Sequence, residues 1–223
     1  MAEFDEYADD YQDLLDDALR ASGEGAEYFH AYKAHALRRL LGAEEPARVL
    51  DYGCGVGMVT RHITEAFGEA RVDGFDVSSE SIGRVPESLR GRGLFTHELD
   101  ELGRDYDLIT ISNVLHHIPP AQRRGVMRDL GERLAPGGRL VIFEHNPLNP
   151  VTRRVVAMCA FDEDAILLWP AESEGLLVEA GLEEVTKSYI LFFPAQFAFL
   201  RGLEPALAWC PLGAQYMAWG RAR

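Results

Sequence analysis

Cysteine is scarce in this chain of 223 residues, which contains three, Cys54, Cys159 and Cys210. Three scattered cysteines cannot form a disulfide framework, and their spacing does not match a zinc site. The sequence also lacks an apolar run close to the roughly 20 residues that a membrane-spanning helix needs. Its acidic start lacks the basic and apolar regions of a signal peptide. We therefore expect a cytoplasmic protein without a membrane partner.

Basic residues are also few. The chain has 22 Lys and Arg against 36 Asp and Glu, which gives a net charge of −14 at pH 7. The longest basic clusters are the pairs Arg38-Arg39, Arg123-Arg124 and Arg153-Arg154. An acidic surface repels nucleic-acid phosphates and anionic lipids, so we expect neither a nucleic acid nor a membrane surface as partner.

The composition is otherwise that of an ordinary globular protein, with 47% apolar and 26% charged residues. The length favours one compact domain with a cap or an insertion. We expect residues 1–45 to form a helical lid or cap and residues 46–223 to form the main domain. Apolar residues at helical spacing predict two helices in the cap, the first with Phe4, Tyr7, Tyr11, Leu14, Leu15 and Ala18, and the second with Phe29, Tyr32, Ala36, Leu37, Leu40 and Leu41.

From Pro46 onward, short β-rich runs alternate with helical stretches. This alternation predicts an α/β fold, with a parallel sheet, right-handed crossovers and helices on both faces. Strands are expected at residues 48–52, 70–77, 93–97, 106–112, 138–145, 184–193 and 214–221, and helices at residues 58–67, 79–89, 121–134, 172–180 and 196–208. Residues 146–170, which contain several prolines, are expected to form an irregular insertion on the substrate side.

The segment VLDYGCGVGMVT, residues 49–60, follows a predicted strand and opens a predicted helix, as a nucleotide-binding glycine loop does. Its spacing excludes two kinds of loop. A dinucleotide fingerprint would need glycine where Met58 stands, and a P-loop would need a Gly-Lys-Ser/Thr ending. Asp51, directly ahead of the glycines, would repel a pyrophosphate but suits a ligand that carries an ammonium group.

S-Adenosylmethionine is such a ligand, because it has an amino-acid moiety, a sulfonium and a nucleoside but no phosphate. Glycines let the backbone approach a ligand closely, and a helix N-terminus offers N–H groups to its carboxylate. An acid at the end of the second strand is then expected to bind the ribose hydroxyls, as in dinucleotide sites. Asp76 stands at that place in the sequence.

Four motifs in order resemble those of class I, Rossmann-like S-adenosylmethionine-dependent methyltransferases of the small-molecule branch. They are D-x-G-x-G-x-G at residues 51–57, the acid Asp76, YDLITISNVLHHI at 106–118 and LAPGGRLVIFE at 134–144. The resemblance covers about residues 48–145, and the last two predicted strands are similar to the sixth and seventh strands of the family. It implies a doubly wound seven-stranded sheet of order 3-2-1-4-5-7-6, with strand 7 antiparallel and the ligand over the carboxyl ends of the strands.

The resemblance also implies which residues contact the methionine part of the cofactor. These are Asp51 and the glycine loop, with Gly53, Cys54 and Gly55. Asn113, at the end of the fourth predicted strand, would meet the same part through its backbone.

Contacts to the nucleoside are implied farther along the chain. Asp76 would bind the ribose, with its neighbour Val77 in the same site. The segment HELDEL resembles the adenine-edge motif of the family, which places Glu98 and Leu99 at the matching positions and Asp100 as a near competitor. A solvated loop charge is the alternative for Glu98.

Histidines are the candidates for the chemistry. Methyl transfer from a sulfonium needs an aligned acceptor and, where necessary, a base, and an imidazole titrates near neutrality. His116 and His117 follow the fourth predicted strand and His145 ends the fifth, so their side chains could converge beside the methyl group, although packing or capping roles are the alternative. Strand alternation points Glu144 away from His145 and disfavours it as the base. No metal is expected, because the aspartate pattern of metal-dependent catechol-type methyltransferases is absent.

Three further residues are candidates for substrate contacts. Tyr7 and Tyr11 in the predicted cap could fold over the ligand and exclude water, or could simply pack the helix onto the core. Arg153, in the insertion, could bind an anionic group of the substrate, or could pair at the surface with Asp162 or Asp164.

The sequence therefore predicts an enzyme that transfers a methyl group from S-adenosylmethionine to an oxygen, nitrogen or carbon of a small metabolite and releases S-adenosylhomocysteine. The base-flipping motif Asn/Asp-Pro-Pro-Tyr/Phe is absent after the fourth predicted strand, where the chain has SNVLHH. Two alternatives stay open, a different reaction on the same cofactor and a non-catalytic ligand-binding scaffold. The sequence leaves monomer and homodimer equally open.

Overall fold

The computed structural model describes residues 23–159 and 165–223. The first predicted helix of the cap, with Tyr7 and Tyr11, lies outside the described residues. The sheet has seven strands in the order β3-β2-β1-β4-β5-β7-β6, and β7 is antiparallel to both of its neighbours. This confirms the predicted fold. The strands are β1 (Arg48–Tyr52), β2 (Arg71–Phe75), β3 (Phe95–Thr96), β4 (Tyr106–Ser112), β5 (Leu134–His145), β6 (Glu183–Ile190) and β7 (Gln215–Arg221).

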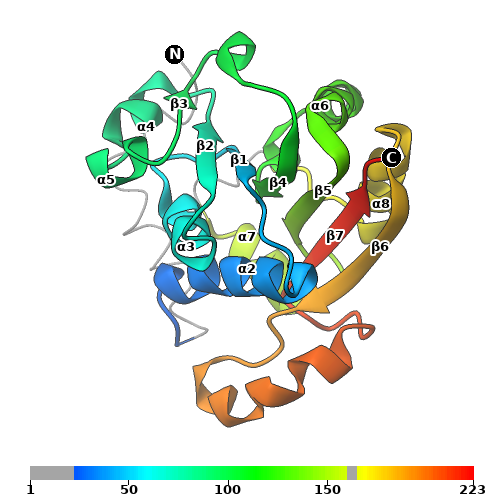
Figure 1. Cartoon of the computed structure of the whole chain (residues 1–223). Coiled ribbons are helices and arrows are strands. Elements are labelled where there is room, and N and C mark those ends of the chain that lie inside the picture. Colours follow the sequence, from blue (N-terminus) through cyan, green and yellow to red (C-terminus); the bar gives the residue numbers. More distant parts are fainter. Residues whose placement is uncertain (1–22, 160–164) are drawn as a thin grey trace.

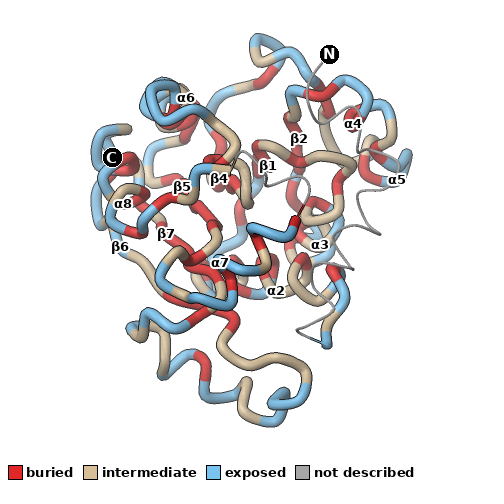
Figure 2. The backbone as a smooth tube through the Cα atoms, turned by 180° about the vertical axis from the view of Figure 1, so that it is seen from behind, coloured by how far each residue is buried: buried red, intermediate tan, exposed pale blue. Residues whose placement is uncertain are grey.

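Helices cover both faces of this sheet (Figure 1). Residues of α2 and α3, such as Leu37 and Ile63, form the core on one face, and residues of α6 and α8, such as Met127 and Leu177, form the core on the other. Figure 2 shows the buried backbone concentrated on the central strands. The helices are α2 (Ala26–Leu41), α3 (Met58–Ala66), α4 (Ser79–Arg84), α5 (Glu87–Arg90), α6 (Pro120–Glu132), α7 (Pro150–Val156) and α8 (Pro170–Glu179), with the short 3-10 helices η3 (Leu99–Glu101) and η4 (Leu115–His117) and the longer η6 (Ala195–Leu207).

Three predicted elements differ from the structure. The helix expected at 79–89 is two helices, α4 and α5, because Pro86 keeps Val85 in an extended conformation. The expected irregular stretch contains α7, whose first N–H groups are capped by the Asn149 side chain. The helix expected at 196–208 is the 3-10 segment η6, which contains Pro205 and is kinked at Phe197.

The topology brings several loops to one edge of the sheet. The strands β1, β2, β4 and β5 are parallel, so the segments that follow them begin at the same edge. Because β7 runs the other way, it contributes its first residue to this edge, and its register pairs Gln215 with His145. The carboxyl edge of the sheet is thus where the candidate residues meet.

None of the helices in the described ranges has the length and apolar character needed to cross a bilayer.

Candidate active site

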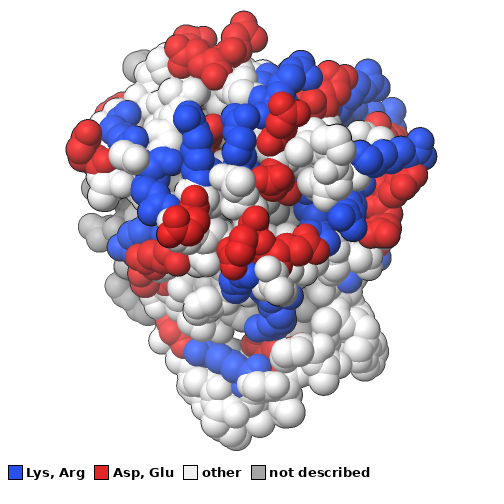
Figure 3. All heavy atoms as spheres, viewed as in Figure 1, with Lys and Arg blue, Asp and Glu red and all other residues white. Residues whose placement is uncertain are grey.

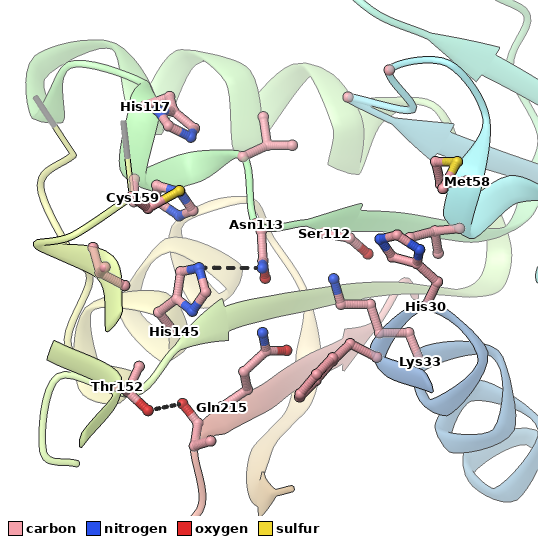
Figure 4. Close-up of a pocket in the computed structure, with 18 of the residues that line it drawn as sticks. His30, Lys33, Met58, Ser112, Asn113, His117, His145, Thr152, Cys159 and Gln215 are labelled. Atoms are coloured by element: carbon pink, nitrogen blue, oxygen red, sulfur yellow. Dashed lines mark hydrogen bonds between the residues drawn. The ribbon is translucent and has the colours of Figure 1, made fainter. Parts of the chain in front are cut away.

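A cavity of about 700 Å³ opens at the carboxyl edge of the sheet. Its walls come from α2, from the segments that follow β1, β2, β4 and β5, from α7, from residues 191–194 and from the start of β7. Its volume lies within the range of about 300–1,000 Å³ that is usual for small-molecule sites. Figure 4 shows part of this wall.

The glycine loop after β1 forms one end of the cavity. The N–H groups of Gly53 and Cys54 both donate to the carbonyl of Phe75, at 2.7 and 2.9 Å. Gly53 has a φ of 77°, and a Cβ at this position would clash with Val114. Only glycine lets the loop lie this close to the segment after β4. Cys54 and Gly55 line the cavity, and burial raises the pKa of the Cys54 thiol.

Asp51 ends up buried at this same end, with 1% of its surface exposed. Its Oδ2 accepts a hydrogen bond from the Thr60 hydroxyl at 2.6 Å. Burial raises the pKa of Asp51 to about 6, although the Thr60 hydrogen bond and the charge of Lys33 act in the opposite direction. The carboxylate lines the cavity, where it can meet a cationic group of a ligand.

Asp76 holds the glycine loop and also lines the cavity. Its two carboxylate oxygens accept the N–H groups of Gly55 at 2.8 Å and Ser78 at 2.9 Å. A carboxylate has about four lone-pair sites, so these two bonds do not exhaust its capacity to accept ligand hydroxyls. The neighbouring Val77 lines the cavity while 61% of its surface is exposed.

Lys33 is a site residue that the sequence analysis missed. It comes from α2, is 4% exposed and lines the cavity, and Figure 4 shows its side chain directed into the space between His30 and Gln215. Burial lowers the pKa of Lys33 to about 8, and the charges of Asp51 and Glu144 act in the opposite direction. Among the described residues Lys33 has neither a hydrogen bond nor an ion pair.

The three predicted histidines lie together at the other end of the cavity. The ring of His116 is 4.1 Å from that of His117 and 5.2 Å from that of His145, between centroids. The Nδ1 of His116 lies 2.6 Å from the Glu144 carboxylate, whose other oxygen accepts the N–H of Leu115 at 2.8 Å. Burial alone would raise the pKa of Glu144, but the charge and the hydrogen bond of His116 lower it. Glu144 does not line the cavity and therefore reaches the site only through His116.

Asn113 connects the two ends of the cavity. Its backbone, with a φ of 56°, turns sharply after β4 and donates its N–H to Phe143 at 2.8 Å, so only its carbonyl could meet a ligand in the way the sequence predicts. Its side-chain Nδ2 lies 3.3 Å from the Nε2 of His145 (Figure 4).

Four buried polar side-chain atoms without a partner are found among the described residues, and all four residues line the cavity: Tyr28 Oη, His30 Nδ1, Asn113 Oδ1 and Gln215 Oε1. Burial lowers the pKa of His30 to about 3, and the charge of Lys33 adds to this effect, so its imidazole is neutral. Buried polar groups are almost always hydrogen-bonded in folded proteins. These four atoms are therefore available for hydrogen bonds with a polar ligand or with water in the cavity.

Some predicted site residues lie elsewhere. Glu98 is exposed and Leu99 packs against the core, and neither lines the cavity. Arg153 is exposed on α7 and is also absent from the lining. Their roles stay predictions that the cavity does not support. Among residues 23–159 and 165–223, no group of three His, Cys, Asp or Glu side chains is arranged to hold a metal ion.

A buried carboxylate joins two parts of the cavity wall. Glu204 of η6 accepts the hydroxyl of Tyr32 on α2 at 2.7 Å, and its other oxygen accepts the N–H groups of Phe192 and Phe193 at 3.0 and 3.3 Å. Phe192 and Phe193 line the cavity, as do several residues of α2. Glu204 thus fixes residues 192–193 to the helix that carries Lys33.

A family model for a methyltransferase domain matches residues 25–186 of the chain. The chain belongs to the S-adenosylmethionine-dependent methyltransferase family. This confirms the predicted family and its cofactor, S-adenosylmethionine. The match begins one residue before α2, so it includes the helix with Lys33 as well as the glycine loop.

Curated relatives match this chain at modest identity. An uncharacterized methyltransferase of Synechocystis sp. is 31% identical over 130 residues, which cover 56% of this chain and 58% of that protein. A trans-aconitate 2-methyltransferase of Mycobacterium ulcerans is 27% identical over 184 residues, which cover 76% of this chain and 66% of that protein. The chain therefore spans less than two thirds of the length of these relatives.

Solved structures share the fold of this chain. A SAM-dependent methyltransferase from Archaeoglobus fulgidus aligns with a TM-score of 0.67 at 15% identity, over 88% of this chain and 95% of that one. Phosphoethanolamine N-methyltransferase 2 of Haemonchus contortus, in complex with S-adenosyl-L-methionine, aligns with a TM-score of 0.59 at 16% identity, over 86% of this chain and 52% of that one.

Proposed function

We propose that the chain binds S-adenosylmethionine at the carboxyl edge of its sheet and transfers the methyl group to a small-molecule acceptor. One observation carries this proposal, the buried pair of opposite charges on Lys33 and Asp51, which face the same cavity without forming an ion pair with each other. An amino-acid moiety is a zwitterion. Its carboxylate would pair with the Lys33 ammonium, and its ammonium with the Asp51 carboxylate.

The remaining cofactor contacts follow along the same edge. Asp76, at the end of β2, would accept the ribose hydroxyls while it keeps the glycine loop in place, and Val77 offers an apolar surface to the nucleoside beside it. The family resemblance supports the same assignment. The α2 part of the predicted cap would then act as one wall of the cofactor site.

The cofactor supplies a methyl group already activated by its sulfonium, so the chain has to position the acceptor and take up its proton. His116 is the residue we assign as the base. Its Nδ1 faces the Glu144 carboxylate at 2.6 Å, so in its neutral form His116 would carry its proton on Nδ1 and present Nε2 to the proton of the acceptor. Glu144 would be a positioning residue, because it fixes this tautomer. His145, held by Asn113, would orient the acceptor beside it.

The surface favours a small acceptor over a nucleic acid. On the face seen in Figure 3, basic side chains are interspersed with acidic ones and do not form a continuous stripe. Together with the net charge of −14, this surface offers little attraction to a phosphate backbone.

Mass spectrometry of the gently denatured protein, followed by calorimetry with S-adenosylhomocysteine, tests the proposal. We expect co-purified S-adenosylhomocysteine or S-adenosylmethionine, binding of added S-adenosylhomocysteine, and transfer of labelled methyl groups to fractionated metabolites. Bound NAD in place of these ligands would refute the cofactor assignment. Binding without methyl transfer would favour one of the alternatives, a different reaction on the cofactor or a ligand-binding scaffold.

A further inference from the structure

The two ends of the cavity differ in charge. Lys33 lies at the cofactor end, where Asp51 also lines the cavity, and the charges of Asp51 and Glu144 both raise the pKa of Lys33 against the effect of burial. Figure 4 places His30, Lys33 and Met58 on one side, and His117, His145, Thr152 and Cys159 on the other. We call this second side the acceptor end, and define it by His116, His117, His145, Val151, Val155 and Val156, all of which line the cavity.

Among the described residues, the acceptor end has no permanent cation. Lys33 is the one lysine in the described lining of the cavity, which contains no arginine. Arg153 and Arg154 are exposed on α7 and are not part of the lining. A buried carboxylate or phosphate without a cation is strongly disfavoured, so the acceptor end does not suit an anionic substrate.

The hydrogen-bonding groups of the cavity also favour an uncharged acceptor. Asn113 Oδ1 and Gln215 Oε1 are buried oxygen atoms without a partner, and both side chains lie between the two ends in Figure 4. An amide oxygen accepts hydrogen bonds and cannot donate them. A hydroxyl could donate to one of these oxygens, whereas an ionised carboxylate has no proton to donate.

The mouth of the cavity next to α7 is apolar. Val151 lines the cavity although 66% of its surface is exposed. Leu148 and Leu212 are exposed outside the lining, and the Asn149 side chain, which does line the cavity, joins their segments by donating to the Leu212 carbonyl at 2.7 Å. Exposed apolar side chains at the rim of a cavity favour the entry of apolar molecules.

We infer that the methyl acceptor is an uncharged, largely apolar molecule whose accepting group is a hydroxyl. This inference rests on the proposed methyltransferase function and adds the acceptor class. The hydroxyl oxygen forms the new bond to the methyl carbon as the carbon–sulfur bond breaks, the electron pair of that bond stays on sulfur, and the hydroxyl proton passes to His116 Nε2. The net change is a methyl ether, neutral S-adenosylhomocysteine and one proton, which leaves through the imidazole.

The inference separates this chain from the relatives named for trans-aconitate, since aconitate carries carboxylates. The full-length protein saturated with S-adenosylhomocysteine would be titrated with matched pairs, a naphthol against the hydroxynaphthoate of the same ring system, and octanol against octanoate. We expect the uncharged member of at least one pair to bind about tenfold or more tightly than its anion, because the anion has to be desolvated without a cation. Transfer of labelled methyl groups to the same compound would show the ether product.

Two variants on α7 sharpen the test. Val155→Lys places a cation at the acceptor end and should reverse the preference toward the anion, with unchanged affinity for S-adenosylhomocysteine as the control for folding. Arg153→Met, on the exposed side of α7, should leave the preference for the hydroxyl compound over its anion unchanged in both matched pairs. The inference is overturned if the anions bind as well as the hydroxyl compounds, if no hydroxyl compound binds, or if Arg153→Met weakens binding of the anion. Failure of S-adenosylhomocysteine itself to bind would instead refute the proposed function.

Discussion

The affinity for S-adenosylhomocysteine should pass through a maximum between about pH 6 and pH 8. Burial raises the pKa of Asp51 to about 6 and lowers the pKa of Lys33 to about 8. A bound ammonium favours ionised Asp51, so affinity is lost as the pH falls below 6. A bound carboxylate favours protonated Lys33, so affinity is lost as the pH rises above 8. Each further pH unit reduces the competent fraction about tenfold until the pKa of the bound form is reached.

Substitution of Lys33 separates its binding role from a structural one. Lys33→Met removes a charged hydrogen bond to the ligand, worth about 1.5–3 kcal/mol, which corresponds to roughly 10–100-fold weaker binding. The same substitution removes a buried charge whose pKa is lowered from 10.5 to about 8. At neutral pH the free protein should therefore become more stable, by on the order of 3 kcal/mol. Affinity and stability should move in opposite directions, whereas loss of a purely structural lysine would lower both.

Isothermal titration calorimetry in buffers of different ionisation enthalpy measures the proton uptake directly. At about pH 8.5 most of the free Lys33 is neutral, so Lys33 should take up about 0.8 proton when the ligand binds. This contribution should be lost in Lys33→Met, which keeps only the proton uptake by the amino group of the ligand. Asp51→Asn should abolish the loss of S-adenosylhomocysteine affinity below about pH 6 and keep the loss above about pH 8. A flat affinity from pH 6 to 9, or an unchanged affinity in Lys33→Met, would refute the assignment of the charged pair.

Four other substitutions test the base, the glycine loop and the core. Glu144→Gln should lower the rate of methyl transfer about 10–100-fold and alter its pH profile, because it disturbs the tautomer of His116. The affinity for S-adenosylhomocysteine should stay unchanged, because Glu144 does not touch the ligand. An unchanged single-turnover rate would show that Glu144 does not position His116. Gly53→Ala should lower the free energy of unfolding in urea by about 1–3 kcal/mol, because its Cβ would clash with Val114. Gly55→Ala should lower it less, because a Cβ there meets no atom within 4 Å. Equal losses of stability in the two variants would contradict the packing argument. Arg123→Met should lower the free energy of unfolding by about 2–4 kcal/mol, because Arg123 is 1% exposed and donates hydrogen bonds to two carbonyls and a carboxylate. A decrease smaller than the error of the unfolding measurement would show that these bonds add no net stability.

The sheet and the cofactor end of the cavity were predictable because local patterns encode them. The β1 and β4 bounds, Arg48–Tyr52 and Tyr106–Ser112, agree with the predicted ranges. Asp51 and Asp76 lie at strand ends, and parallel strands bring their ends to one edge. The cap of α7 was also visible in the sequence, since Asn149-Pro150 is a typical helix start, but the neighbouring prolines suggested an irregular segment instead.

Other site residues had weak or no local signals. Lys33 lies four residues after Phe29 and four before Leu37, on the apolar stripe of its helix, and a lysine on such a stripe is the signal that could have revealed it. Gln215 enters the site only through the antiparallel register of β7 with β5, which no local pattern encodes. Strand alternation predicted that Glu144 points away from His145, but its contact with His116 depends on the turn after β4, which no local pattern encodes.

The Glu204 carboxylate makes the two walls of the cavity mechanically dependent on each other. It accepts hydrogen bonds from Tyr32 on α2 and from the backbone of Phe192 and Phe193. A ligand that pulls α2 inward through Lys33 must therefore either drag the phenylalanine wall along or break a buried bond. Binding at the wall formed by α2 is thereby linked to the shape of the wall formed by Phe192 and Phe193, and thermodynamic linkage requires that a ligand at the second wall influence a ligand at the first in equal measure.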